Sequence, residues 1–274
     1  MERTFQKSIT AGDGGSVAVD VYGDAGSPGL LVVPGVMSDA WGWRHVARAT
    51  TAWPSVSVVN RRGRAPSSPL GDSYSIRTEV DDLKAVIEQL GEPQDIFGWS
   101  YGGRVALLLA SERPVEHVIA YEPVAPGFGA DALPSLREAE ELGDRGRSVE
   151  IVNRQVSGFS AEHVENLRAD RDAWATLCRL SEPLYTELGA LTRAQLPETL
   201  GSQAGVIDLI IGEDNVGAAP YGTSFEQVRS RTRDAEVHRL PGQGHLAHID
   251  APEALGRLLD SLVRVGKAQP ETLI

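Results

Sequence analysis

The stretch Gly98-Trp99-Ser100-Tyr101-Gly102-Gly103 joins a short apolar run, Asp95 to Gly98, to a largely apolar run, Tyr101 to Arg113. The first run predicts a short strand and the second a buried helix. Glycines at such a junction let the strand and helix backbones approach closely, while the tight turn strains its central residue. A Gly-x-Ser-x-Gly turn between a strand and a helix therefore predicts that Ser100 is a nucleophile.

Strands and helices alternate on both sides of this turn. The strands are predicted at Phe5–Thr10, Val17–Tyr22, Gly29–Val33, Val56–Asn60, Asp95–Gly98, Val118–Tyr121, Val206–Ile211 and Glu236–Leu240. Helical spacing or a long apolar run predicts helices at Tyr74–Leu90 and Tyr101–Arg113, and near Phe225–Arg231 and Pro252–Val265. Such alternation predicts the α/β class, with a mostly parallel sheet, helices on both faces, and the first hairpin as an antiparallel edge.

The alternation stops between residues 125 and 201, where no clear strand is found and glycines and prolines interrupt helical segments. This block predicts an inserted helical cap, and residues 1–124 and 202–274 then form the core domain. We expect the cap to lie over the carboxyl ends of the strands, where open α/β sheets bind ligands. An apolar helical stripe in the block is expected to face the sheet and shape the substrate pocket: Trp174, Leu177, Leu184, Tyr185 and Leu188.

Composition narrows the possible partners and compartments. The 274 residues carry 38 acidic against 26 basic side chains, a formal net charge of −12. A nucleic-acid partner is not expected, because binders need a basic face, and neither is an anionic membrane surface. Cys178 is the single cysteine, so neither a disulfide within the chain nor a thiolate zinc site is expected. Without an apolar leader or a long apolar run, the prediction is a soluble cytoplasmic protein.

A serine nucleophile needs a base, and His245 is the candidate. A serine hydroxyl is unreactive near neutral pH unless a neighbouring group takes its proton, and imidazole is suited to take and return it. His245 ends Gly242-Gln243-Gly244-His245, which follows the last predicted strand. His248 is interpreted as an ordinary residue at the start of the next helix. Motifs for nucleotide, flavin or metal binding are missing, so no cofactor and no metal are predicted.

These marks resemble the α/β-hydrolase family over nearly the full chain: Pro34-Gly35 after the third strand, the turn at Ser100, and the glycine-rich loop at His245. Arg61-Arg62-Gly63-Arg64 is similar to a further family stretch, with Asn60 near its usual Asp. The resemblance implies that the backbone N–H groups of Tyr101 and Val36 bind the oxyanion of an acyl-transfer intermediate. Trp41, Trp43, Trp99 and Phe128 are candidates for an apolar substrate pocket.

The acid that orients His245 has two candidates. The family usually places it three residues after the glycine that closes the penultimate strand, where this chain has Asn215, with Asp214 one residue earlier. Some branches, such as certain haloalkane dehalogenases, carry it after the preceding core strand, where Glu122 stands. Tyr121-Glu122-Pro123 also resembles a stretch of actinobacterial hydrolases. Glu122 is favoured slightly over Asp214, and both keep the order Ser, acid, His.

The resulting hypothesis is a cofactor-free serine hydrolase acting on an ester, lactone or thioester of a mainly apolar small molecule. Ser100 would attack the carbonyl, and His245, held by Glu122 or Asp214, would move the proton. Two alternatives stay open. The first is a lyase, cyclase or isomerase using the same pocket, suggested by the unusual loop at Gly212 to Asn215, and the second is a non-catalytic binding protein on the same fold.

Overall fold

The computed structural model describes residues 1–263. One sheet of eight strands in the order β1-β2-β4-β3-β5-β6-β7-β8 runs through it. β1 and β2 pair antiparallel with each other, β2 pairs antiparallel with β4, and the other neighbours are parallel. The strands span Arg3–Thr10, Ser16–Gly23, Leu30–Val33, Ser55–Asn60, Asp95–Trp99, Val115–Tyr121, Ala204–Gly212 and Glu236–Leu240. The predicted α/β class, with a mostly parallel sheet and an antiparallel hairpin at one edge, is confirmed.

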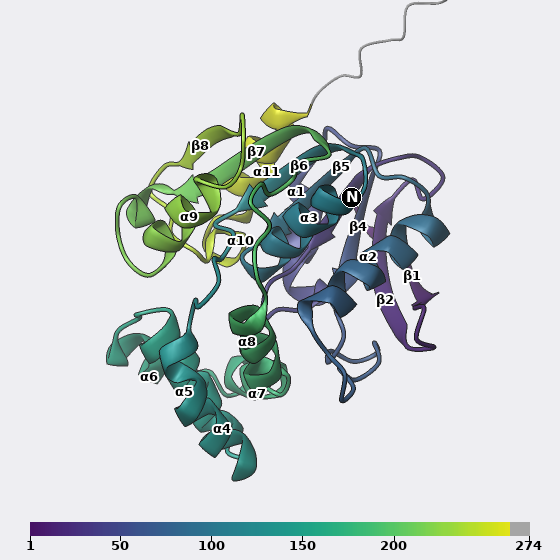
Figure 1. The fold of residues 1–274 in the computed structure, drawn as a ribbon. Helices are drawn as coiled ribbons and strands as arrows, with labels where there is room; N and C mark the ends of the chain where they lie inside the picture. Colours follow the sequence, from purple (N-terminus) through teal and green to yellow (C-terminus); the bar gives the residue numbers. More distant parts are fainter. Residues whose placement is uncertain (264–274) are drawn as a thin grey trace, which may run out of the picture.

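Helices cover both faces of the sheet (Figure 1). α2 (Ile76–Leu90), α3 (Tyr101–Glu112) and α9 (Tyr221–Arg229) pack on one face, and α1 (Arg44–Ala49), α10 (Ala247–Asp250) and α11 (Pro252–Leu262) on the other. Leu31 and Val33 belong to the first apolar layer, while Leu30 and Val32 belong to the second. Because successive side chains of a strand point to opposite faces, a fully buried parallel strand is apolar throughout.

α2 shows how local sequence determines the buried face and the first residue of a helix. Its predicted stripe is buried at Val80, Leu83, Val86 and Ile87, as expected for a helix with one apolar face. The helix was predicted from Tyr74, but it begins at Ile76, because Ser75 and Thr78 satisfy each other's backbone N–H groups in a capping box. The predicted last helix, Pro252–Val265, ends at Leu262 in the described chain, and its residues 264 and 265 lie outside the described residues.

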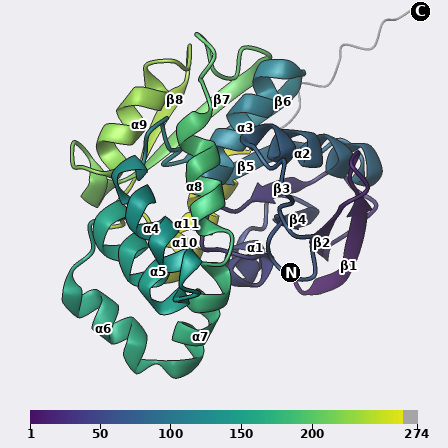
Figure 2. The same cartoon turned by 60° about the horizontal axis from the view of Figure 1, so that its bottom comes forward.

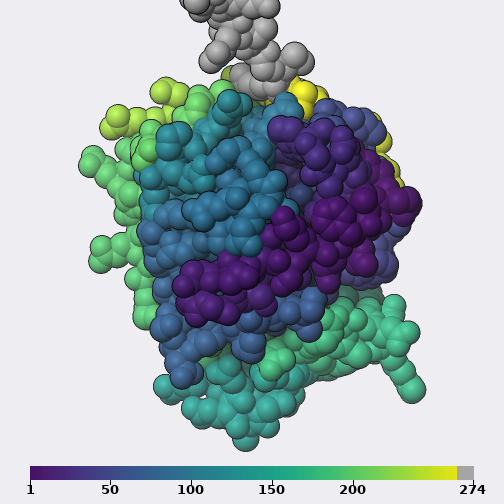
Figure 3. All heavy atoms as spheres, turned by 90° about the vertical axis from the view of Figure 1, so that its right-hand side faces the viewer, coloured from purple at the N-terminus to yellow at the C-terminus, as the bar shows by residue number. Residues whose placement is uncertain are grey.

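A group of helices separates β6 from β7. It comprises η2 (Ala130–Ala132), α4 (Leu133–Glu141), α5 (Arg145–Ile151), η3 (Val152–Val156), α6 (Ala161–Ala169), α7 (Arg171–Leu180) and α8 (Leu184–Arg193). Figure 1 shows this group below the sheet, and Figure 2 brings it forward. In Figure 3 it forms the green lower end, below the purple strands of the N-terminal hairpin. We refer to residues 130–193 as the cap.

The cap joins the core through buried apolar side chains. Leu184 and Leu188 of α8 are buried in the same apolar layer as α3. Trp174 and Tyr185 of the predicted stripe are only partly buried, and Trp174 lies under the guanidinium of Arg168 within the cap. None of the helices within residues 1–263 combines the length and the hydropathy that crossing a bilayer would require.

Candidate active site

Ser100 occupies the sharp turn between β5 and α3. Its backbone has φ 57° and ψ −118°, a conformation that costs a residue with a side chain of order 1–3 kcal/mol. The turn closes because its neighbours are glycines. A Cβ on Gly98 would clash with the Gly102 and Gly103 backbone, and a Cβ on Gly102 would clash with the backbone of β3. The sequence pattern thus identified a strained turn that the surrounding backbone holds in place.

His245 and Glu122 are in direct contact. Nδ1 of His245 lies 2.6 Å from Oε2 of Glu122, and both side chains are almost completely buried. His245 comes from the loop after β8, and its carbonyl accepts a hydrogen bond of 2.8 Å from Trp99 Nε1. The Tyr221 ring stacks on the imidazole with centroids 3.6 Å apart. A carboxylate on Nδ1 leaves Nε2 as the nitrogen available for proton transfer.

Glu122 is fixed in turn by the loop that follows β7. Oε1 accepts hydrogen bonds from the Gly212 backbone N–H at 2.9 Å and from Asn215 Nδ2 at 2.9 Å, and Oε2 lies 3.0 Å from the same amide nitrogen. The Glu122 backbone has φ 41°, a second strained position directly at the end of β6. Asn215, at the position where the family usually has its acid, thus contacts the carboxylate rather than the imidazole.

The alternative acid, Asp214, does not reach His245. Asp214 is exposed in the short turn η4 (Glu213–Asn215), and its backbone N–H donates to the Gln243 carbonyl at 3.1 Å. The turn directs this side chain to solvent and the next one inward. Within residues 1–263, the carboxylate in contact with His245 is that of Glu122, so the proposal of Asp214 as the partner of His245 is wrong.

The two predicted oxyanion donors lie beside the nucleophile. Tyr101 is the first residue of α3, where backbone N–H groups have no partner within the helix and the helix dipole favours negative charge. The loop after β3 comes very close to Ser100, since a Cβ on Gly35 would lie 3.0 Å from the Ser100 Cβ. Val36, the next residue, lines the same cavity as Ser100.

That cavity, of about 210 Å³, lies between the core and the cap. Ser100 and His245 share it with mainly apolar side chains, of which the cap supplies Val152, Val156, Phe159, Leu167 and Leu177, and the core supplies Val36, Met37, Trp99, Phe128, Tyr221, Leu246 and Ile249. Apolar walls around a few polar groups are typical of small-molecule sites. Of the four aromatic residues predicted for the substrate pocket, Trp99 and Phe128 line this cavity.

The other two predicted pocket residues lie elsewhere. Trp41 is 59% exposed and stacks under the Arg44 guanidinium. Trp43 is fully buried in the core against Phe97 and Trp99. Both belong to η1 (Ala40–Trp43), whose 3₁₀ turn points the two rings in different directions, neither of them into the cavity. The prediction is wrong for Trp41 and Trp43.

His248, interpreted from sequence as an ordinary residue at the start of a helix, also lines the cavity. It lies in α10, with its ring stacked on Trp43 at 4.6 Å and close to Trp99 at 4.3 Å. Burial, together with the nearby charge of His245, lowers the pKa of His248 to about 3. The ring is therefore uncharged near neutral pH. In the sequence, the spacing of three residues between His245 and His248 was the feature that could have indicated a place for His248 at the site.

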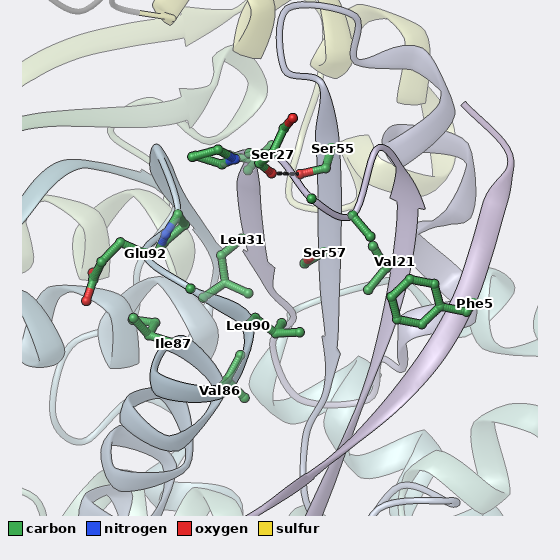
Figure 4. A pocket seen from close by; sticks show the side chains of 17 residues that line it. Phe5, Val21, Ser27, Leu31, Ser55, Ser57, Val86, Ile87, Leu90 and Glu92 are labelled. Carbon is green, nitrogen blue, oxygen red and sulfur yellow. Dashed lines mark hydrogen bonds between the residues drawn. The ribbon is translucent and has the colours of Figure 1, made fainter.

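A second cavity, of about 180 Å³, lies between α2 and the amino ends of β3 and β4 (Figure 4). Its labelled side chains include Leu31, Val86 and Leu90, and its polar contact is the bond from Ser55 Oγ to the Ser27 carbonyl at 2.8 Å. It contains neither Ser100 nor His245.

A possible metal site lies at Asp208, Glu236 and His238, whose potential ligand atoms lie within 4.8 Å of one another. His238 Nε2 already contacts Asp208 Oδ1 at 2.6 Å.

Comparison with known proteins identifies the family of this chain. The sequence model of the "Alpha/beta hydrolase family" matches residues 30–258, so the chain belongs to the alpha/beta hydrolase family and is an enzyme of hydrolase type. It is 23% identical over 252 residues to the sn-1-specific diacylglycerol lipase ABHD11 of Mus musculus, covering 84% of this chain and 79% of the relative.

Two further similarities show how widely this architecture is used. The chain is 26% identical over 274 residues to 2-succinyl-6-hydroxy-2,4-cyclohexadiene-1-carboxylate synthase of Serratia proteamaculans, covering 89% of this chain and 96% of the relative. The crystal structure of an alpha/beta hydrolase from Sphaerobacter thermophilus superimposes with a TM-score of 0.77 at 21% identity, covering 93% of this chain and 99% of that one. The latter similarity supports the fold.

Proposed function

We propose that the protein is a serine hydrolase that cleaves an ester, lactone or thioester bond of a small, mainly apolar molecule, with Ser100, His245 and Glu122 as its catalytic triad. The observation that carries this proposal is the contact between His245 Nδ1 and Glu122 Oε2, made beside a cavity that also contains Ser100 on its strained turn. The arrangement matches the roles of nucleophile, base and orienting acid.

The first half of the reaction forms an acyl-enzyme. Ser100 Oγ attacks the substrate carbonyl carbon as its proton passes to His245 Nε2, and the carbonyl oxygen becomes an oxyanion bound by the Val36 and Tyr101 N–H groups. The oxyanion then re-forms the carbonyl, the bond to the leaving oxygen or sulfur breaks, and His245 gives its proton to that leaving atom. In a lactone the leaving hydroxyl stays attached to the acyl chain.

The second half restores the enzyme. Water attacks the acyl carbon while His245 takes one of its protons, and the Ser100–carbon bond breaks as that proton returns to Ser100 Oγ. Glu122 stabilises the positive imidazolium in both halves and holds the ring orientation. The products are a carboxylic acid and an alcohol or thiol.

The cavity supports the choice of a small apolar substrate. Its volume of about 210 Å³ and its aliphatic and aromatic walls favour a compact acyl group over a long polar chain. The similarity to a synthase favours a second candidate, a cofactor-free lyase or cyclase that uses the same serine and histidine. Such an enzyme would use His245 mainly to move protons.

Reaction with a fluorophosphonate probe tests the proposal. Wild-type protein is expected to form one covalent adduct at Ser100, located by mass spectrometry, and Ser100→Ala is expected to form none. Hydrolysis of p-nitrophenyl esters of increasing acyl length would follow the same pattern. Turnover by Ser100→Ala at the wild-type rate would overturn the proposal, and a wild type without any adduct would favour the lyase or cyclase.

A further inference from the structure

The stretch after β4 contains a buried arginine that the proposed mechanism does not use. Arg61 is fully buried, and its guanidinium donates to Glu79 Oε1 at 2.6 Å and to the Gly35 carbonyl oxygen at 2.8 Å. Arg61 Nη2 also forms an ion pair with Glu187, whose Oε1 lies 2.8 Å away. The opposing carboxylates outweigh the cost of burial and raise the pKa of Arg61, so the group is charged at all relevant pH values.

The bond to Gly35 bears directly on the predicted oxyanion hole. The Gly35 carbonyl and the Val36 N–H belong to one planar trans peptide, so they point in opposite directions and turn together. An arginine that fixes the carbonyl therefore also fixes the direction of the Val36 N–H. Arg64 fixes the same loop at a second point, because its Nε donates a hydrogen bond to the Ser38 carbonyl oxygen at 3.0 Å. Between these two points Met37 has φ 56°, a strained conformation.

The second oxyanion donor is tied to the same arginine. The Arg61 guanidinium lies 4.8 Å from the centre of the Tyr101 ring. The Tyr101 hydroxyl lies 3.0 Å from that of Tyr74, which donates to Glu79 Oε1 at 2.6 Å. Tyr101 starts α3, so these contacts hold the first turn of the helix against the group that holds Gly35. One buried cluster thus contacts both elements that supply oxyanion donors.

The cap contributes the carboxylate that completes this cluster. Glu187 of α8 is fully buried and contacts Arg61 as well as the guanidinium of Arg64, whose Nη2 donates to Oε2 at 2.8 Å. Two arginines, Arg61 and Arg64, then face two glutamates, Glu79 and Glu187, and the buried charges balance. Removing one member of such a cluster leaves an uncompensated buried charge, which is strongly unfavourable.

We propose that Arg61 and Glu187 are positioning residues for the oxyanion hole, and that the hole reaches its working geometry only when α8 of the cap is docked. This inference rests on the proposed function and extends it, because it makes the cap part of the apparatus that stabilises the transition state. Opening of the cap at α8 would remove one of the two carboxylate partners of Arg61 and relax the peptide between Gly35 and Val36.

A neighbouring ion pair provides the matched control. Arg62 Nε donates to Asp82 Oδ2 at 2.6 Å, and Nη2 donates to Asp82 Oδ1 at 2.7 Å. Arg62 and Asp82 are each 4% exposed. This pair also joins the stretch after β4 to α2, but its side chains contact neither the loop at Gly35 nor the cap. Arg62 also contacts Asp13, with Nη1 2.7 Å from Oδ2, so Asp82→Asn removes one of two carboxylates from a buried arginine, as Glu187→Gln does for Arg61.

The test compares Glu187→Gln and Arg61→Lys with Asp82→Asn and wild type. For the first two variants we expect kcat on a p-nitrophenyl ester and the rate of fluorophosphonate labelling to fall by about 10- to 100-fold, the range for partial loss of an oxyanion donor, with KM within about threefold. The affinity for a trifluoromethyl ketone, which forms a tetrahedral adduct, should fall by a similar factor. Asp82→Asn should retain the wild-type kcat to within about twofold, even if its Tm falls as far as the Tm of Glu187→Gln and Arg61→Lys.

Several outcomes would overturn the inference. One is a folded Glu187→Gln variant that reacts with the fluorophosphonate at the wild-type rate. Another is a loss of kcat in Asp82→Asn equal to that in Glu187→Gln. If Glu187→Gln is not recovered in folded form, Glu187→Asp keeps the charge but shortens the side chain, and an unchanged kcat in that variant would also contradict the inference. Ser100→Ala separates the two proposals. If wild type labels and Ser100→Ala does not, the proposed function stands and the Glu187 variants decide the inference alone; if wild type does not label, both fail.

Discussion

Within residues 1–263, two buried imidazoles contact carboxylates, and their surroundings differ. His245 contacts Glu122 through Nδ1 and lines the pocket that contains Ser100. His117, in the middle of the sheet, uses both ring nitrogens, with Nδ1 2.8 Å from Asp95 and Nε2 2.7 Å from Asp208. Burial and a carboxylate partner are common to both residues, so neither feature by itself marks a catalytic histidine.

The difference lies in what the second ring nitrogen contacts. Burial acts to lower the pKa of His117, but Asp208 and Asp95 overcome it and raise that pKa to about 9. His117 is thus a charged side chain that links the carboxylates of β5 and β7 across β6. His238 also contacts Asp208, and Trp53 donates to Asp95. An imidazole held on both sides cannot exchange a proton with a substrate, whereas one held on one side can.

The largest expected effect comes from removing each imidazole in turn. His245→Ala is expected to lower kcat by about 1,000-fold or more, because the serine loses its base, while Tm stays close to wild type. His117→Gln is expected to keep kcat per folded molecule within about twofold and to lower Tm, because it breaks a buried charge network. Ester hydrolysis and thermal denaturation measure both. Loss of kcat in folded His117→Gln would remove the distinction.

Next in size is the effect of the carboxylate partner. Glu122→Gln is expected to lower kcat by about 100-fold or more, because the amide cannot offset the imidazolium charge. Asp214→Asn removes the exposed alternative acid and should leave kcat within about twofold of wild type. Steady-state kinetics on one ester compare the two directly. Equal losses in both variants would contradict the assignment of Glu122.

The pH dependence of stability sharpens the contrast between the two histidines. The pKa of His117 is about 9 in the folded state, above the ordinary value of 6.5. Its contribution to stability is therefore complete below pH 6.5 and is lost as the pH rises through 9, by about 3 kcal/mol. Urea denaturation between pH 6.5 and 9.5 should show this decline in wild type and a smaller one in His117→Gln. Parallel curves would count against a protonated His117.

The smallest effects concern the pocket walls. Phe128→Ala removes an apolar wall of the cavity and should raise KM for an apolar ester by about 3- to 10-fold, as expected for the loss of one apolar contact. Trp41→Ala alters an exposed ring and should leave KM within about twofold. Initial-rate measurements on a common substrate provide both values. A larger effect for Trp41 than for Phe128 would reverse the placement of these two side chains.

Several features could be predicted because they depend on short stretches of sequence. The turn at Ser100 follows from glycines at fixed spacing between an apolar strand and an apolar helix, and the contact of Glu122 with His245 was the favoured alternative for the acid. The identity of the acid could not be settled from the chain, because Glu122 and Asp214 end neighbouring strands. The register of β6 and β7 and the direction of one short turn separate them.

Other features depend on residues that are distant in sequence. Arg61 belongs to an arginine-rich stretch of the sequence, but its contacts Gly35, Glu79 and Glu187 come from three separate elements. Trp41 and Trp43 show the same limit on a smaller scale, since two aromatic residues separated by one position end up at the surface and in the core.

The order of the elements, the strained serine turn and the position of the histidine after the last strand all follow from the amino-acid sequence. These features depend on backbone conformation and on apolar periodicity, which are local properties of the chain. By contrast, the folded arrangement of the chain sets which acid contacts the histidine, which rings line the cavity, and how the cap contacts Arg61. Those outcomes depend on which strand ends and loops come together, because a hydrogen bond or an ion pair forms only within a few ångströms.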